Sequence, residues 1–255
     1  MSRMISYPAE GNDACRQVED GSYWFAHRNA CIVELMRLYP PGGAVYDIGG
    51  GNGFVSLALQ QAGFPTVLVE PGNGAFNAVG RGVARIVHST LEDVEFAAGS
   101  LDAVGAFDVI EHIERDDAFV STIRTLLRPG GRLYCTVPAI KCLWSVEDVR
   151  AGHFRRYTQR TLAELLRRNS LDVEFLSPAF AWLIGPVWCL RAMPHVLGFK
   201  AHNGGADAMK ADHSLPRSLE PLVRRCHAWE LRRLAHRNPL PFGTSLLCVA
   251  KRSAT

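Results

Sequence analysis

The sequence contains no C-x-x-C pair, although it has 7 cysteines among its 255 residues. An odd number of cysteines at these spacings fits neither a disulfide framework nor the usual zinc motifs, so we expect a reducing compartment. No apolar run reaches the ~20 residues that a membrane-spanning helix needs, because Ser177, Pro178 and Pro186 interrupt the longest one. The first residues also lack a basic start followed by an apolar stretch. We therefore expect no signal peptide and a cytoplasmic protein.

Charge of one sign is not in large excess either. The 28 Lys and Arg residues face 25 Asp and Glu residues, which leaves a net charge of +3. Basic and aromatic residues do not alternate as they do in grooves for single strands, so we expect no nucleic-acid partner. With 47% hydrophobic and 21% charged residues and no internal repeat, the composition is that of an ordinary folded domain.

Apolar runs that suit strands alternate with helical patterns along the chain, which predicts an α/β fold with a mostly parallel sheet. The expected strands are residues 44–48, 65–70, 101–107, 132–137, 171–176 and 244–251, with a weaker one at 84–87. The expected helices include residues 54–62, 116–127 and 157–169, the last with Thr158 as its N-cap.

We predict a single domain with four parts. Residues 1–43 form a helical cover that packs on the sheet or over its ligand, and residues 44–177 form the core. Residues 178–242 form an insertion, with a polar linker at 203–212 and a basic helix near 219–236, and residues 243–255 hold the last strand. The insertion is either a lid or a membrane-contact element. The charged residues of the basic helix, including Glu220 and Glu230, are expected to form a solvated face, and contact with an anionic membrane surface or an acidic partner is the alternative.

The most informative stretch runs from a strand through a glycine loop into a helix, at residues 45–54. Starting from Gly49 or Gly51, the sixth position holds Phe54 or Ser56, so the dinucleotide fingerprint G-x-G-x-x-G is not met. No Lys-Ser or Lys-Thr pair follows the glycines, which excludes a P-loop. The loop must therefore serve another ligand, or be a purely structural turn.

The pattern Asp-x-Gly-x-Gly-x-Gly at residues 47–53 resembles the first motif of class I S-adenosylmethionine (SAM)-dependent methyltransferases. Residues 107–113 resemble the fourth motif of this family, and residues 127–131 match the turn before its fifth strand. Residues 24–29 (Trp-Phe-Ala-His-Arg-Asn) and 152–158 (Gly-His-Phe-Arg-Arg-Tyr-Thr) resemble a bacterial subgroup of the family that acts on small molecules, glycans or lipids. The resemblance covers roughly residues 20–178. It implies a Rossmann-like fold with a seven-stranded sheet, SAM as the cofactor, and methyl transfer as the activity.

The resemblance also implies a cofactor site. Glu70, at the end of the second strand, would accept both ribose hydroxyls. Thr90 stands where an Asp that holds the adenine is common, with the Leu91 backbone N–H beside it and Asp93 as the alternative acid. The expected cofactor-binding residues are Asp47, Gly49, Gly50, Gly51, Gly53, Glu70, Thr90, Leu91, Phe107, Asp108 and Arg28. Arg28 either pairs with the ligand carboxylate or braces the fold, and Phe107 would lie near the sulfonium.

The segment that follows the fifth strand, residues 138–157, is expected to form the wall of the acceptor site. Within it His153 is the candidate general base, Asp148 its orienting carboxylate and Tyr157 a hydrogen-bonding partner. The alternative is that this segment only braces the following helix. Glu111 and His112 are interpreted either as part of the fourth motif or as a carboxylate at a helix start and a packed histidine. No metal is expected.

We therefore predict methyl transfer to an O or N nucleophile of a small or amphipathic metabolite, such as a biosynthetic intermediate, a glycan or a lipid-linked precursor. Phe107 is followed by Asp-Val-Ile rather than Pro-Pro-Tyr, which disfavours an amino-methylating DNA enzyme. Two alternatives stay open: a SAM-binding pseudoenzyme or scaffold without turnover, and a nicotinamide-dependent oxidoreductase. The sequence predicts neither the acceptor nor the oligomeric state.

Overall fold

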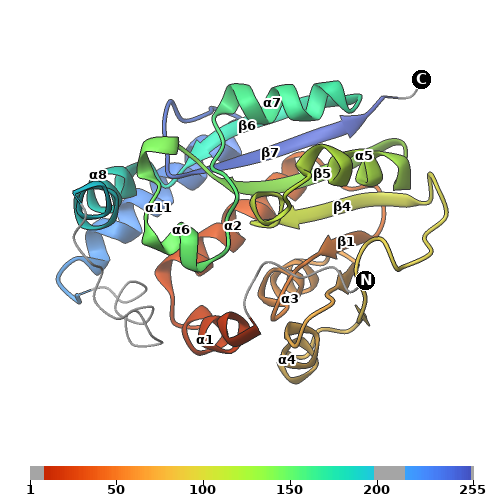
Figure 1. Cartoon of the computed structure of the whole chain (residues 1–255), viewed down its shortest axis with the longest axis horizontal. Helices are drawn as coiled ribbons and strands as arrows, with labels where there is room; N and C mark the ends of the chain where they lie inside the picture. The colour runs from red at the N-terminus through yellow and green to blue at the C-terminus, as the bar shows by residue number, and fades with distance from the viewer. Residues whose placement is uncertain (1–8, 198–215, 254–255) are drawn as a thin grey trace.

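The computed structural model of the chain describes residues 9–197 and 216–253. Its centre is a seven-stranded sheet in the order β3-β2-β1-β4-β5-β7-β6 (Figure 1). The strands are β1 (Val45–Ile48), β2 (Thr66–Val69), β3 (Ile86–Val87), β4 (Leu101–Phe107), β5 (Leu127–Pro138), β6 (Leu171–Ala179) and β7 (Ser245–Arg252). β7 runs antiparallel to both of its neighbours, and the pairs from β3 to β5 are parallel. All seven predicted strands are present, so the predicted α/β class is confirmed.

Helices cover both faces of the sheet, because its central strands are apolar on both sides. In β5, Leu133 and Cys135 pack into one buried cluster and Tyr134 into the other. The first cluster lies under α5 (Asp116–Leu126) and α7 (Gln159–Arg168), and the second under α2 (Tyr23–Leu38), α3 (Phe54–Gln61) and α11 (Glu220–Ala235). The Thr158 hydroxyl accepts a hydrogen bond from the Thr161 N–H, which confirms the predicted N-cap of α7.

The N-terminal part packs on the sheet, which is one of the two roles predicted for it, and its role as a cover over a ligand stays a prediction. Ile32, Leu35 and Met36 of α2 are buried in the second cluster, so this helix packs on the sheet. The preceding helix, α1 (Ala9–Glu19), lies beside α3 and α4 (Gly74–Arg81), against the glycine loop (Figure 1). Neither α4 nor the short α6 (Val146–Arg150) was predicted from the sequence.

The region before the last strand contains short turns of helix followed by a long helix. These are η3 (Ala181–Leu183), α8 (Ile184–Val187), the π-helical η4 (Trp188–Ala192), α9 (Met193–Val196) and α11. η4 contacts α6, whereas α11 packs against α2 on a face of the sheet. The predicted polar linker at 203–212 lies outside the described residues, and the lid role of this region stays a prediction.

Two predictions were wrong, one about the start of a strand and one about the exposure of a helix. β5 begins at Leu127, five residues before the expected start, because Leu127 pairs with Leu101 before a register shift that precedes Ala103. Gly130, with a φ of 77°, absorbs this irregularity inside the strand instead of forming a separate turn. The charged residues of α11 do not all form a solvated face, since Glu230 is only 4% exposed.

Candidate functional site

The glycine loop follows β1 at the point where the strand order reverses between β1 and β4. In open α/β sheets, ligands bind beyond the carboxyl ends of the strands at this switch point. A Cβ added to Gly49 would lie 3.1 Å from a methyl group of Val109, the second residue after β4, so the two loops touch across the switch point. The chain thus gathers the predicted residues of both loops at one edge of the sheet.

The three spaced glycines of the loop all have positive φ: 67° at Gly49, 54° at Gly51 and 72° at Gly53. Gly53 is the N-cap of α3, and a Cβ there would lie 2.6 Å from Val83 and 2.8 Å from Ala78. At Gly51 the nearest atom to an added Cβ is Asn12 Oδ1, at 3.7 Å. Gly53 is therefore required for packing. At Gly51 the missing side chain leaves the backbone of the loop accessible, as the close approach of a ligand requires.

Asp47 is fully buried in β1 under this loop. Its Oδ2 accepts a hydrogen bond of 2.7 Å from the Ser56 hydroxyl, and its Oδ1 has no partner among the described residues. Burial raises the pKa of the Asp47 carboxyl to about 6, against the lowering effect of the Ser56 hydrogen bond. Through the Ser56 hydrogen bond, Asp47 fixes the first turn of α3 to β1.

Glu70 follows the last residue of β2 and is 6% exposed. Its two oxygens accept hydrogen bonds from the backbone N–H groups of Gly51, at 2.9 Å, and Gly72, at 2.7 Å. Burial raises the pKa of this carboxyl, although both hydrogen bonds oppose the shift. A carboxylate is thus held at the open side of the loop, where a nucleoside hydroxyl could compete for it.

The loop after β3 contains the two residues considered for the adenine. The Thr90 hydroxyl donates to Asp93 Oδ2 at 2.7 Å and accepts from the Asp93 N–H at 3.2 Å. Thr90 and Asp93, the two alternative contacts for the adenine, are therefore hydrogen-bonded to each other in one turn. The Leu91 side chain belongs to the core under α5.

Asp108, the first residue after β4, has a φ of 56°, a left-handed conformation that Asp tolerates better than most residues. It accepts a 2.6 Å hydrogen bond from Arg28 Nη1, and the guanidinium of Arg28 lies 5.1 Å from the Trp24 ring centre. Arg28 thus braces α2 against β4, which is one of the two roles predicted for it. The Phe107 ring is buried in the cluster under α2, and its place near a sulfonium stays a prediction.

Sequence reasoning missed the contacts that hold α1 over the glycine loop. Asn52 donates to the backbone oxygen of Asn12 at 2.7 Å. Arg81 of α4 forms a 2.6 Å ion pair with Glu19 and donates to the Asn52 backbone oxygen at 3.0 Å. These residues are far apart in sequence and follow no family pattern that we identified, so only the fold brings them together.

On the acceptor side the structure brings His153 and Asp148 together. His153 Nδ1 lies 2.9 Å from Asp148 Oδ1, and the same carboxylate accepts two hydrogen bonds from Arg156. Burial opposes the ionisation of Asp148, but the hydrogen bonds from His153 and Arg156 outweigh it and lower the carboxyl pKa to about 2. An ionised Asp148 can orient the imidazole of His153.

Tyr157 was wrongly predicted to be a partner of this pair. Its hydroxyl donates instead to Asp116 Oδ2, at 2.8 Å, and its side chain is buried in the core under α7. Burial and the Asp116 carboxylate raise the pKa of the phenol. The reason is geometric, because the Tyr157 N–H bonds to the Pro138 carbonyl and this pairing directs the ring toward α5 rather than toward His153.

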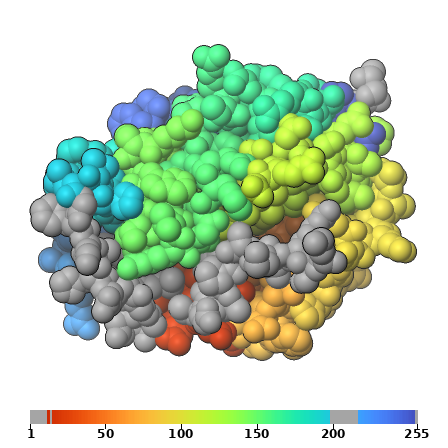
Figure 2. Space-filling view, in the orientation of Figure 1, coloured from red at the N-terminus to blue at the C-terminus, as the bar shows by residue number. Residues whose placement is uncertain are grey.

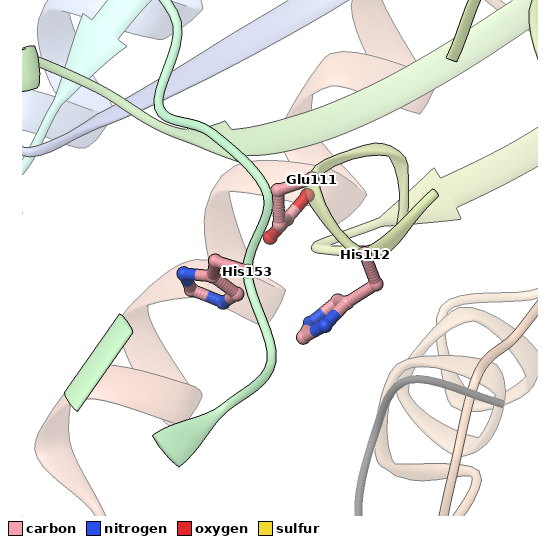
Figure 3. A group of neighbouring side chains, drawn as sticks. All are labelled: Glu111, His112 and His153. Carbon is pink, nitrogen blue, oxygen red and sulfur yellow. The ribbon is translucent and has the colours of Figure 1, made fainter. Parts of the chain in front are cut away.

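Two more ionisable residues face His153 from the short turn after β4, η1 (Ile110–His112). Figure 3 shows Glu111 and His112 on this turn with their side chains directed toward His153. Glu111 is 1% exposed, and burial, followed by the charge of Asp108, raises its pKa. Burial and the neighbouring His153 lower the pKa of His112 to about 4.

Figure 2 shows the segment that follows β5, coloured green, on the face turned to the viewer and beside the cyan α8 region. This segment forms one wall beside η1, since the Phe154 N–H donates to the Glu111 carbonyl at 2.8 Å. A separate groove of about 650 Å³ lies between α2, α3 and α11, and no residue of the glycine loop lines it.

Comparison with known proteins decides the family. A family model described as "Methyltransferase domain" matches residues 24–174, which is more than half of the chain. The chain belongs to this methyltransferase family. Its motifs place it among the class I SAM-dependent methyltransferases, as the sequence predicted, and SAM is the cofactor of this family.

Several relatives of this methyltransferase domain have curated names. It is 29% identical over 105 residues to a ubiquinone biosynthesis O-methyltransferase of Xanthomonas axonopodis, a match that covers 38% of this chain and 44% of the relative. A probable SAM-dependent methyltransferase of Mycolicibacterium smegmatis is 25% identical over 171 residues, or 66% of each chain. The matches to the first curated relatives thus span less than half of their length.

Among solved structures, phosphoethanolamine N-methyltransferase 2 of Haemonchus contortus, in complex with SAM, is similar with a TM-score of 0.60 and 17% identity. The similarity covers 97% of this chain and 58% of that one. At this identity the likeness establishes a shared fold, which agrees with the sheet order of the methyltransferase domain. Among the described residues, no helix is long and apolar enough to cross a membrane.

Proposed function

We propose that this methyltransferase domain binds SAM in the glycine loop and transfers its methyl group to an oxygen or nitrogen of a small or amphipathic metabolite. The observation that carries the proposal is the position of Glu70. Its buried carboxylate is held against the Gly51 N–H at the carboxyl end of β2, next to the switch point where this fold binds ligands.

The residues present fit SAM. The open backbone at Gly51 lets a ligand approach, and the Glu70 carboxylate can exchange its Gly51 and Gly72 partners for ribose hydroxyls. The remaining predicted contacts, from Thr90, Leu91 and Asp108, line up along the carboxyl ends of β3 and β4. We assign them to the adenine and the methionine portion of the cofactor.

The bound sulfonium supplies an activated methyl group, so the chain mainly has to align the acceptor and remove its proton. The new bond joins the methyl carbon to the acceptor oxygen or nitrogen while the carbon–sulfur bond breaks, and S-adenosylhomocysteine (SAH) leaves as a neutral thioether. We assign the removal of the acceptor proton to His153, and the contact of its ring with Asp148 supports this assignment. The presence of this pair favours turnover over the alternative of a binding scaffold.

The acceptor class rests on the relatives. Two curated relatives are named as O-methyltransferases of ubiquinone biosynthesis, and the structurally similar N-methyltransferase is named for phosphoethanolamine. α11 adds a feature that suits an amphipathic acceptor or a membrane surface, because Leu222 and Trp229 are exposed beside Arg224 and Arg225. Contact with a membrane stays a prediction.

Calorimetry with SAM, SAH and NADH tests the proposal. We expect the chain to bind SAM and SAH but not NADH. Glu70→Ala should weaken SAM binding at least tenfold, or about 1.4 kcal/mol, because the ribose hydroxyls lose their acceptor.

Glu95→Ala, at an exposed carboxylate in the loop after β3, is the matched control and should bind SAM as the unmodified chain does. His153→Ala should also retain SAM affinity, because it acts on the acceptor side. Equal SAM affinity in Glu70→Ala and Glu95→Ala would remove Glu70 from the site, and NADH binding would favour the oxidoreductase alternative.

A further inference from the structure

Three potential metal ligands meet at the acceptor side of the sheet. Glu111 and His112 lie on η1, and His153 lies on the segment that follows β5 (Figure 3). One ligand atom from each residue lies within 4.8 Å of the ligand atoms of the other two. The backbone holds the two segments together, because the Phe154 N–H donates to the Glu111 carbonyl at 2.8 Å.

Glu111 is the residue that the rest of the fold leaves unexplained. It is 1% exposed, and its Oε2 has no hydrogen-bond partner among the described residues. Buried carboxylates are normally paired with a cation or with donors, or they coordinate a metal. The guanidinium of Arg28, whose charge acts on Glu111, is hydrogen-bonded to Asp108.

His153 is oriented as a metal-binding histidine would be. Its Nδ1 is held by Asp148 at 2.9 Å, so Nε2 is the nitrogen left for a ligand. Asp148 is itself fixed by Arg156 and by the Ser145 N–H, at 2.9 Å. A carboxylate behind a histidine is the usual outer partner of a metal ligand, because it sets the ring orientation and makes the other nitrogen more basic.

We propose that Glu111, His112 and His153 bind one divalent transition-metal ion of the Zn²⁺ class. Two nitrogens and one carboxylate oxygen suit such an ion, whereas Mg²⁺ prefers oxygen ligands alone. Ligands at ~2.1 Å from a shared tetrahedral ion stand about 3.4 Å apart, so small side-chain rotations close the present spacing. No metal was predicted from the sequence, because the cysteines show no zinc spacing and methyl transfer from a sulfonium does not require a metal.

Three protein ligands leave a fourth position open, which is typical of catalytic rather than structural zinc. The three ligands lie on η1 and on the segment that follows β5, the side on which the proposed function places the acceptor, so an acceptor bound on that side reaches the open position. A hydroxyl oxygen bound there would lose its proton to solvent more readily, because the ion lowers its pKa. This catalytic role of the ion rests on the proposed function. When the ion is bound, His153 is a metal ligand and no longer the group that accepts the proton.

Metal analysis of the purified full chain tests the site directly. The chain is loaded with Zn²⁺, dialysed and analysed for bound metal, and Co²⁺ loading is followed by its visible absorption. We expect one ion per chain and tetrahedral Co²⁺ bands. Glu111→Gln and His153→Ala should each weaken Zn²⁺ binding at least tenfold, while Mg²⁺ should not compete.

His236→Gln is the control, because His236 is exposed at the C-terminal end of α11 and its side chain bonds to the Arg232 carbonyl. It should keep full zinc binding. Glu111→Gln preserves side-chain shape, and SAH calorimetry on the same variant shows whether the fold and the cofactor site survive. The proposal is overturned if the unmodified chain binds no zinc, or if Glu111→Gln and His153→Ala bind zinc as tightly as the unmodified chain. Either result counts against the metal site alone, because SAH binding tests the cofactor site separately.

Discussion

At the scale of single residues, the site depends on carboxylates that the fold buries. Asp47, Glu70 and Glu111 are each 6% exposed or less, and burial raises the pKa of all three. Their chemistry differs because their partners differ. Asp47 accepts from one hydroxyl, Glu70 accepts from two backbone N–H groups, and the Oε2 of Glu111 has no partner within the part of the chain that the structure describes.

Asp47 carries a prediction about pH. Its pKa is about 6 in the folded chain against 3.8 in the unfolded reference, so the folded state binds the proton more tightly. The contribution of Asp47 to stability is therefore greatest below pH ~4 and falls as the pH rises toward 6. A difference of two pKa units corresponds to about 3 kcal/mol.

We expect Asp47→Asn to raise the free energy of unfolding at pH 7.5 by about 1–3 kcal/mol and to reduce its decline between pH 4 and 6. Urea unfolding across this pH range measures both effects, with the exposed Glu95→Gln as the control. A variant less stable than the unmodified chain at pH 7.5 would show that the Ser56 hydrogen bond, and not burial, dominates at this position.

At the scale of elements, one buried carboxylate joins three helices. Glu230 of α11 lies 2.9 Å from His27 Nε2 of α2 and accepts hydrogen bonds from the N–H groups of Phe180, at 3.1 Å, and Ala181, at 2.7 Å. It thus caps η3 and fixes α11 on α2. The charge pattern of α11 predicted a solvated face for Glu230, because a helical charge pattern by itself does not show which carboxylate meets buried donors.

Truncation of this carboxylate should loosen all three helices. We expect Glu230→Ala to lower the free energy of unfolding by about 2–4 kcal/mol, because buried donors lose their acceptor. Glu220→Ala, at an exposed position of the same helix, should change it by less than about 0.5 kcal/mol. Urea unfolding compares the two variants, and equal stabilities would mean that α11 is held by its apolar contacts alone.

At the scale of the whole molecule, the proposed cofactor site is assembled from distant parts of the chain. The glycine loop and Glu70 come from the core, and α1 closes over them through Asn52, Glu19 and Arg81. The acceptor side comes from η1 and the segment that follows β5. A ligand in the loop should therefore stabilise α1 as well as the loop itself.

Hydrogen exchange measures this coupling. We expect saturating SAH to slow amide exchange in residues 9–20 and 49–53, and to leave α7, on the other face of the sheet, unchanged. At 100 times its dissociation constant, SAH should also add about 2.7 kcal/mol to the free energy of unfolding. Slower exchange in the loop without any change in α1 would show that α1 is not coupled to the cofactor.

The sequence by itself determined the fold class, the positions of the strands and the glycine loop, because these depend on local apolar patterns and on the backbone freedom of glycine. The spacing of Asp148 and His153, five residues apart on one segment, was also sufficient to predict their pairing. These features need no knowledge of the rest of the chain.

Only the tertiary structure decided the partners of buried polar groups. Tyr157 bonds to Asp116 and Arg28 to Asp108, 41 and 80 residues away, and Glu111 meets His153 only because η1 and the segment after β5 lie side by side. A buried polar group takes whichever donor or acceptor the packing brings within about 3 Å, and that depends on the whole fold rather than on neighbours in sequence.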